Sequence, residues 1–204
     1  ALSIEIFYKD CKLISNCGYF QNYKHQLNSI SKSTVTHSTL ILDNKSSCSL
    51  KKDQDGILKT NQDLKILKKS SLSEKNFLCI NGSHDGYLKE YGVIHERKIE
   101  YFSNKFLFMG TDKLIKKKNF KTSSFEIRFH LEPGVKVTKT QDGKSILIEL
   151  ENSGWKFSCK DHKIDVETGL YFGKKNSFLE NQNIFVSGIT LKEDQEIKWE
   201  INKI

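Results

Sequence analysis

Apolar and polar side chains alternate along many short stretches of this 204-residue chain, and the clearest stretch is 123–131. Its apolar members are Phe125, Ile127, Phe129 and Leu131. A period of two places one face of a strand in a core and the other in solvent. Similar stretches occur at 2–8, 12–15, 34–42, 77–80, 92–101, 105–109, 145–150, 155–159, 164–172, 183–190 and 197–201. We therefore predict an all-β fold, an antiparallel β-sandwich of about a dozen strands, rather than a βαβ fold.

The stretch 51–76 breaks this pattern because it is rich in Lys, Asp, Gln and Ser. It could form a long loop, or it could carry one short strand at 64–68. The sequence contains no internal repeat and no linker that would divide it. Residues 1–204 are therefore predicted to form a single domain.

The net charge of +8 favours an acidic partner, such as a uronic-acid polysaccharide or a nucleic acid. The lysine run 116–118 could contact such a polyanion, or it could be a solvated turn. No nucleic acid is expected, because the sequence has no basic helix, RNP-like aromatic pattern or zinc-finger spacing. No membrane span is expected either, because no apolar run approaches about 18 residues.

The five cysteines form no CxxC pair, and their odd number leaves at least one thiol free. Cys11 and Cys17 could be joined across a short hairpin, although sequence does not supply the geometry that a disulfide needs. Cys159 shares a predicted strand face with Trp155 and Phe157. It is therefore expected to be a small core residue.

Chemistry-bearing side chains are concentrated in 83–87, Ser-His-Asp-Gly-Tyr, and in 92–97, Gly-Val-Ile-His-Glu-Arg. His95 and Arg97 lie two residues apart in a predicted strand and therefore point to the same face. His84 precedes them in a turn punctuated by glycine, where a side chain can reach a cleft. Two imidazoles, a phenol and a guanidinium this close together suit an anionic polar ligand.

These two motifs resemble the C-terminal domain of heparinase II/III-like polysaccharide lyases. Five further segments match that family in the same order: 13–18 (Leu-Ile-Ser-Asn-Cys-Gly), 36–40 (Thr-His-Ser-Thr-Leu), 125–135, 154–157 and 197–199. The resemblance runs from end to end of the chain. It implies a β-sandwich that follows a helical toroid domain.

The resemblance also implies β-elimination on uronic-acid-containing glycans, heparin/heparan-like or alginate-like, in a cleft between the toroid and the sandwich. The expected partners are an acidic polysaccharide and the protein's own N-terminal helical toroid domain. A strand pattern begins almost at Ala1, so we expect a fragment without the toroid that is inactive alone, although its parent protein is a lyase. The resemblance also implies that the protein is located in the periplasm or cell envelope.

His84 and Tyr87 are predicted to be the acid–base pair that such a lyase needs. The C5 proton of a uronate becomes acidic when its carboxylate is neutralised, and Arg97 is predicted to bind that carboxylate with support from His95. A base must then take the C5 proton while a donor reaches the O4 leaving group. Two alternatives remain open. His84 could cap the Asp-Gly turn while Tyr87 packs, and His95 and Arg97 could pair with an acidic residue inside the sandwich.

His37 lies on an apolar face of the predicted strand 34–42, where a hydrogen-bonded core histidine is common. The resemblance implies a place beside the cleft, because the matching histidine binds zinc in relatives that hold this metal. The matching carboxylate position is Asn16 here, which is a poor zinc ligand, and another ligand would precede Ala1. We therefore predict a catalytic role for His37 and no cofactor, with His37 only a weak metal candidate.

Three other residues have a predicted place. His130 is expected to face solvent or to contact a neighbouring strand, whereas Trp155 and Trp199 are expected in the core rather than as platforms for sugar stacking. The alternative function for the whole chain is a non-catalytic glycan-binding or domain-bracing β-sandwich module.

Overall fold

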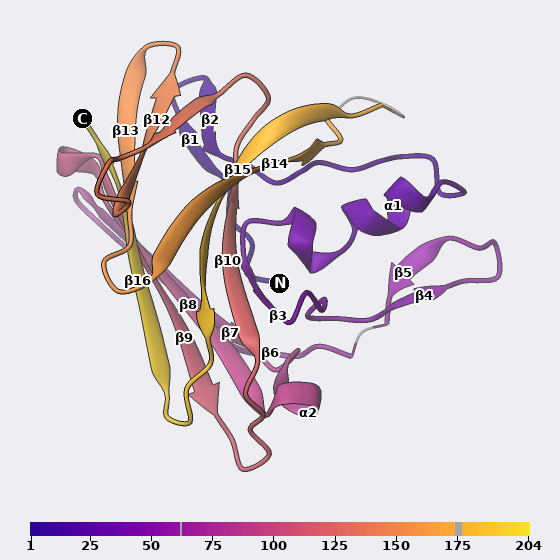
Figure 1. The fold of residues 1–204 in the computed structure, drawn as a ribbon. Coiled ribbons are helices and arrows are strands. Elements are labelled where there is room, and N and C mark those ends of the chain that lie inside the picture. Colours follow the sequence, from indigo (N-terminus) through magenta and orange to yellow (C-terminus); the bar gives the residue numbers. More distant parts are fainter. Residues whose placement is uncertain (62, 174–176) are drawn as a thin grey trace.

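Two antiparallel sheets form the body of the computed structural model, which describes residues 1–61, 63–173 and 177–204 (Figure 1). The larger sheet contains β6 (Ile66–Glu74), β7 (Phe77–His84), β8 (Val93–Phe102), β9 (Leu107–Lys116), β11 (Lys136–Lys139), β12 (Ser145–Leu150), β13 (Ser153–Ser158) and β16 (Gln195–Lys203). Their order across the sheet is β11-β12-β13-β16-β9-β8-β7-β6. The smaller sheet contains β3 (Leu40–Leu42), β10 (Ser124–His130), β14 (Lys163–Tyr171) and β15 (Leu179–Ile189), in the order β14-β15-β10-β3.

Aromatic side chains join the two sheets. The ring of Phe129 on β10 lies 4.8 Å from that of Phe157 on β13 and 4.7 Å from that of Trp199 on β16. All three are buried, as is Trp155. Large aromatic side chains that alternate along strands contribute much of the apolar area that such a core removes from water. The predicted antiparallel β-sandwich is therefore confirmed, and so is the core position of both tryptophans.

Short elements lie outside the two sheets. They are the hairpin of β1 (Ile6–Tyr8) and β2 (Cys11–Ile14), the hairpin of β4 (Leu50–Lys52) and β5 (Leu58–Thr60), helices α1 (Gln26–Ser31) and α2 (Leu88–Tyr91), and 3₁₀ turns η1 (Thr34–Thr36) and η2 (Ser103–Lys105). His25 caps α1, because its Nδ1 accepts a hydrogen bond from the backbone N–H of Leu27. Gly92 ends α2 in the left-handed region, with φ of 65°. None of the described helices is long and apolar enough to cross a membrane.

The predicted strand 34–42 is wrong in its first half. Residues 34–36 form η1, and only 40–42 form a strand, β3. The Thr36 hydroxyl donates to the carbonyl of Ser33 at 2.8 Å, a local bond that competes with strand pairing. His37 is the C-cap of η1, so it does not share a strand face with the residues that follow.

The stretch 51–76 holds more structure than predicted, since it contains β5 and β6 together with most of β4. β6 pairs with β7 from residue 66 to 74, but every one of its side chains is exposed. A strand without a buried face carries no apolar alternation. The sequence therefore indicated only a long loop or one short strand at 64–68, and the latter overlaps the first residues of β6.

The structure also answers three smaller predictions. His130 is buried and its Nδ1 lies 2.6 Å from Oδ1 of Asn183 on the paired strand β15, as the inter-strand alternative expected. The thiols of Cys11 and Cys17 are both free, so these residues form no disulfide bridge. Cys159 is buried in the core, as predicted.

Candidate functional site

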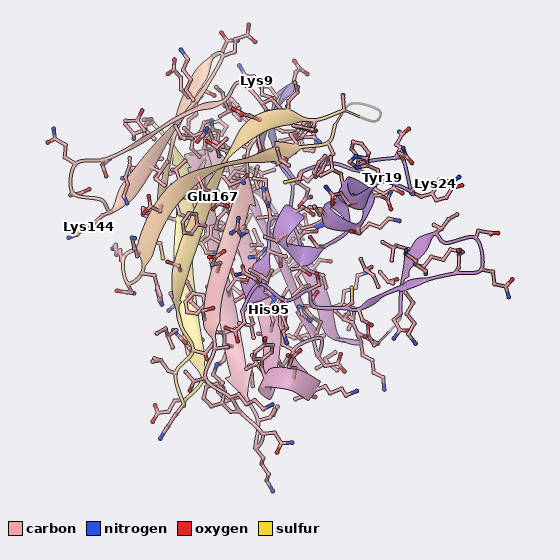
Figure 2. All side chains as sticks on the ribbon, turned by 45° about the vertical axis from the view of Figure 1, so that its right-hand side comes forward. Lys9, Tyr19, Lys24, His95, Lys144 and Glu167 are labelled. Atoms are coloured by element: carbon pink, nitrogen blue, oxygen red, sulfur yellow. The ribbon has the colours of Figure 1, made fainter. Side chains whose placement is uncertain are left out.

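A chain of buried side chains crosses the inner face of the larger sheet. His84, His95 and Asp112 come from the neighbouring strands β7, β8 and β9, and His84 pairs directly with His95 in the sheet register. Nε2 of His84 lies 3.2 Å from Nδ1 of His95, and Nε2 of His95 lies 2.6 Å from Oδ1 of Asp112. His95, which is labelled near the middle of the view in Figure 2, is completely buried, with an exposed fraction of 0%.

The hydrogen-bond partners assign the protons in this chain. The backbone N–H of Gly86 donates to Nδ1 of His84 at 3.1 Å, so Nε2 of His84 carries the proton and donates to His95. Nε2 of His95 then donates to the carboxylate of Asp112. Burial lowers the pKa of His84 to about 2, with His95 adding to the shift, and burial also lowers the pKa of His95. Both imidazoles are therefore neutral at pH 7.

Arg97 completes this cluster. Its Nε donates to Oδ1 of Asp112 at 2.7 Å and one terminal nitrogen donates to Oδ2 at 3.1 Å, which gives a two-point ion pair. Burial alone would raise the pKa of Asp112, but Arg97 and His95 hold the pKa of this carboxyl well below its usual range. The alternative in which His95 and Arg97 pair with an acidic residue inside the sandwich is confirmed, and the residue is Asp112.

Sequence reasoning missed Asp112 because the predicted strand 105–109 ends before it. β9 runs to Lys116, and its buried positions Gly110, Asp112 and Leu114 follow the period of two. The signal that could have revealed Asp112 is a carboxylate at an inward-facing position, once the apolar alternation is continued beyond residue 109. Nε1 of Trp199 also donates to Oδ2 of Asp112, at 2.9 Å.

Tyr87 is also buried, with 1% of its surface exposed. Its hydroxyl donates to the carbonyl of Leu40 at 3.1 Å, and burial raises its pKa well above the usual range. Together with the bond from Gly86 to His84, this confirms that His84 caps the turn and that Tyr87 packs. In this closed arrangement neither residue offers a substrate a free nitrogen or hydroxyl, and their acid–base role stays a prediction.

His37 differs from the other four predicted residues because its side chain is partly exposed. Nδ1 lies 2.8 Å from the carbonyl of Ser33, which can only accept, so Nδ1 carries the proton. Burial lowers the pKa of His37, and the neutral ring therefore keeps its lone pair on Nε2. Within the described residues, Nε2 makes no hydrogen bond.

The residues around His37 do not fit a zinc ion. Oδ1 of Asn16 accepts from the backbone N–H of Ser38 at 2.8 Å, and Nδ2 of Asn16 donates to Glu5 at 3.2 Å. Both ends of this amide are therefore occupied. In the described part of the chain, no group of three His, Cys, Asp or Glu side chains is arranged to hold a metal.

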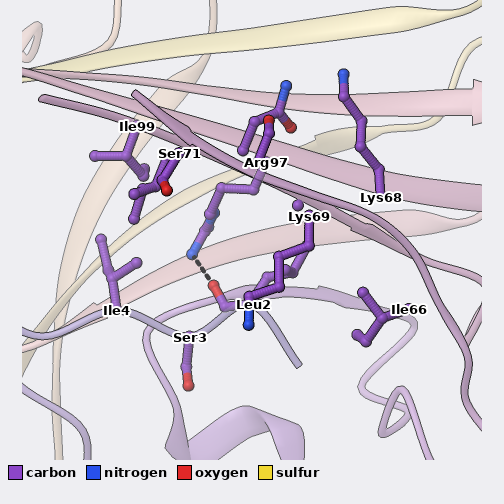
Figure 3. A pocket seen from close by; sticks show the side chains of 13 residues that line it. Leu2, Ser3, Ile4, Ile66, Lys68, Lys69, Ser71, Arg97 and Ile99 are labelled. Carbon is purple, nitrogen blue, oxygen red and sulfur yellow. Dashed lines mark hydrogen bonds between the residues drawn. The ribbon is translucent and has the colours of Figure 1, made fainter. Parts of the chain in front are cut away.

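A cavity of about 700 Å³ opens beside Arg97, between the N-terminal segment and strands β6 to β8 (Figure 3). Arg97 reaches its wall and donates to the carbonyl of Leu2 at 3.0 Å. The other walls carry several aliphatic side chains, Leu2, Ile4, Ile66, Ile80 and Ile99, with Lys68 and Lys69 on β6. Arg97 is 3% exposed, so its charge is directed to Asp112 and to backbone carbonyls rather than into the cavity. Substrate contact by His95 and Arg97 stays a prediction.

The buried histidines predict strong acid sensitivity. Burial lowers the pKa of His84 to about 2 and that of His130 to about 4, against 6.5 in the unfolded chain. Below pH 6.5 the unfolded chain therefore binds more protons than the native state, and stability falls. Between pH 6 and 4.5 we expect the free energy of unfolding to drop by about 2–3 kcal/mol per pH unit for the two groups together. Urea unfolding at stepped pH measures this slope, and a flat profile over that range would contradict it.

The chain was compared with protein families, curated proteins and solved structures. The family model described as heparinase II/III-like, C-terminal, matches residues 1–200. The heparan sulfate lyase HepC from Pedobacter heparinus has a TM-score of 0.79 at 15% identity, with 98% of this chain and 30% of that chain covered. The heparinase III that is the BT4657 gene product has a TM-score of 0.74 at 15% identity, with 99% and 30% covered.

The chain thus spans about 30% of the length of these solved structures. A search of curated proteins found no match. At 15% identity the structural likeness shows a shared fold, while the family model covers nearly the whole chain. The chain belongs to the heparinase II/III-like, C-terminal family.

Proposed function

We propose that this chain forms one side of the active-site cleft of a polysaccharide lyase that cleaves uronic-acid-containing glycans, heparin/heparan-like or alginate-like, by β-elimination. The observation that carries the proposal is the family match over residues 1–200. The similar solved proteins are a heparan sulfate lyase and a heparinase III, each about three times as long as this chain. We assign the other side of the cleft to a helical toroid domain of the same protein. We also propose that the protein is located in the periplasm or cell envelope.

The reaction sets clear requirements for the cleft. A base removes the C5 proton of the uronate, electrons form the C4=C5 double bond, and the C4–O4 bond breaks as O4 receives a proton. Charge develops on the uronate carboxylate, so donors or cations must face it. A general base must hold a lone pair within hydrogen-bond reach of C5.

His37 fits the base requirement best among the five predicted residues. It is neutral at pH 7, its Nδ1 proton is held by Ser33, and its Nε2 lone pair has no partner among the described residues. Nε2 can therefore accept a proton. We assign His37 the direct catalytic contact on this side of the cleft.

The buried cluster positions His37 through the next residue, Ser38. Arg97 donates to the carbonyl of Ser38 at 2.7 Å, and Asn16 accepts from its N–H at 2.8 Å. The Ser38 hydroxyl donates to the carbonyl of Ser15 at 2.6 Å. Because the N–H, carbonyl and hydroxyl groups of Ser38 are all hydrogen-bonded, the backbone next to His37 is fixed in position. Supporting residues preorganise a site by restricting the catalytic side chain in this way. We therefore assign Arg97, His95 and His84 a positioning role.

The second candidate function is a non-catalytic glycan-binding or domain-bracing module. The observation that favours it is the burial of His84, Tyr87, His95 and Arg97, whose polar atoms are committed to protein partners. Under this reading the sandwich stabilises a neighbouring domain, and substitutions in it change affinity or stability but not the chemical step.

The test is an assay of the full-length protein on heparan sulfate and on alginate, with unsaturated uronide followed by its ultraviolet absorbance. We expect release from one of these polymers by the full-length protein and none from the 204-residue chain alone, because half of the cleft is missing. Release by the chain alone would show that the site is complete without a second domain. No release from any uronate polymer by the folded full-length protein would leave the bracing function.

A further inference from the structure

A cationic aromatic surface covers the connection between β2 and β3, on the side of the molecule away from the hairpin that carries Lys144 (Figure 2). It consists of Tyr19, Tyr23, Lys24 and Lys32. The two tyrosines are 46% and 45% exposed. Nζ of Lys32 lies 5.3 Å from the centre of the Tyr19 ring, and Nζ of Lys24 lies 5.9 Å from that of Tyr23. Each exposed ring therefore has an ammonium group close to it.

The backbone under this surface is held firmly. Phe20, between the two tyrosines, is buried in a small core with Cys17 and Phe172. Nδ2 of Asn28, which is fully buried on α1, donates to the carbonyl of Phe20 at 2.6 Å and to the hydroxyl of Tyr19 at 3.0 Å. An aromatic side chain whose hydroxyl is anchored from below loses little further freedom when a ligand covers it.

The local charge points to an anionic ligand. The sequence contains no Asp or Glu between Cys11 and Leu42, whereas Lys24 and Lys32 both lie in this range. Among the described residues, neither Lys24 nor Lys32 lies within salt-bridge distance of a carboxylate, although Nζ of Lys32 donates to the carbonyl of Leu58 at 2.8 Å. Ammonium groups without a neighbouring carboxylate attract anions.

Exposed tyrosine faces beside ammonium groups suit one class of ligand in particular. The apolar C–H face of a sugar ring packs against a flat aromatic face, while a carboxylate or sulfate on the same sugar meets the ammonium. The surface also shares its chain segment with His37, whose Nδ1 is bonded to the carbonyl of Ser33, the residue after Lys32. We propose that Tyr19, Tyr23, Lys24 and Lys32 form a binding subsite for an acidic oligosaccharide, outside the catalytic position. This proposal rests on the proposed function, whose ligand class it specifies.

The test is the affinity of the 204-residue chain for a size-defined heparin oligosaccharide, measured by calorimetry, with a neutral dextran oligosaccharide as the comparison probe. We expect binding of heparin only, and weaker binding as salt rises. Tyr23→Ala and Lys24→Gln should each weaken binding about two- to fivefold, and the double variant about tenfold. The matched controls are Phe7→Ala, an exposed ring with Lys12 over it at 5.3 Å, and Lys144→Gln, which removes the same charge elsewhere. Both should stay within about twofold of the unmodified chain.

Several outcomes would overturn the subsite. One is an equal loss of affinity in the control variants, which would indicate diffuse charge attraction. Others are equal binding of dextran and no binding of heparin. The last is a self-associated chain that dissociates in the double variant, which would make the surface a contact between copies of the chain. Thermal unfolding checks that each variant is folded. The lyase assay of the full-length protein separates the two proposals. If the chain binds heparin but the full-length protein shows no turnover, the subsite is supported and the lyase function is contradicted. If the full-length protein shows turnover but the 204-residue chain does not bind heparin, the lyase function is supported and the subsite is contradicted.

Discussion

Replacing Asp112 by alanine is expected to lower the free energy of unfolding by about 3–5 kcal/mol, because it removes one partner of a buried ion pair. Asp112 is fully buried and accepts hydrogen bonds from His95, Arg97 and Trp199. Without the carboxylate, the guanidinium of Arg97 would stay in the core with only backbone carbonyls to face it. Urea unfolding, followed by the fluorescence of the two buried tryptophans, measures the change.

Glu196→Ala is the matched control for Asp112→Ala. Glu196 lies on the neighbouring strand β16 and pairs with Lys113 at 3.6 Å and Lys198 at 3.5 Å, but its side chain is 44% exposed. An exposed ion pair contributes about 0–1 kcal/mol, so this variant should unfold almost as the unmodified chain does. If Asp112→Ala changed stability no more than Glu196→Ala, the buried cluster would not be the support that its geometry indicates.

Replacing His37 by glutamine in the full-length protein is expected to reduce kcat by about 10²–10⁴-fold, the usual contribution of a positioned general base. Glutamine keeps a polar group of similar length but cannot accept a proton near neutral pH. KM should change little, because the imidazole is assigned to proton transfer rather than to holding the glycan. The initial rate of unsaturated uronide release, measured over a range of substrate concentrations, separates kcat from KM.

His162→Gln controls for the loss of a partly buried imidazole. His162 directly precedes β14 and is therefore remote in sequence from the β2–β3 connection. Its ring centre lies 5.5 Å from that of Phe125. Its replacement should leave kcat unchanged. A full kcat in His37→Gln would assign the base to another residue, and an equal fall in both variants would indicate a general loss of structure.

The alternation of apolar and polar residues predicted most of the strands. The predicted strand 145–150 matches β12 at both ends, and 123–131 differs from β10 by one residue at each end. These strands have one face in the core, so the alternation of apolar residues in their sequence shows which side chains are buried. Of β6, the sequence offered no more than a possible short strand at 64–68, because the pairing of β6 with β7 buries none of its side chains. The hydrogen bonds of Ser33 and Thr36, which turn the chain before His37, also override the strand pattern there.

By itself, the sequence determined the all-β class, the shared direction of His95 and Arg97, and the family resemblance, because these depend on local period and on ordered motifs. The tertiary structure alone decided what the two side chains meet. Arg97 is opposite Asp112 in the register of β8 and β9, and Arg97 reaches Ser38, which is 59 residues away along the chain. Register and long-range packing are set by the fit of whole sheets, and a local pattern contains neither. That fit buries the side chains of His84, Tyr87, His95 and Arg97, and it leaves Nε2 of His37 without a hydrogen-bond partner among the described residues.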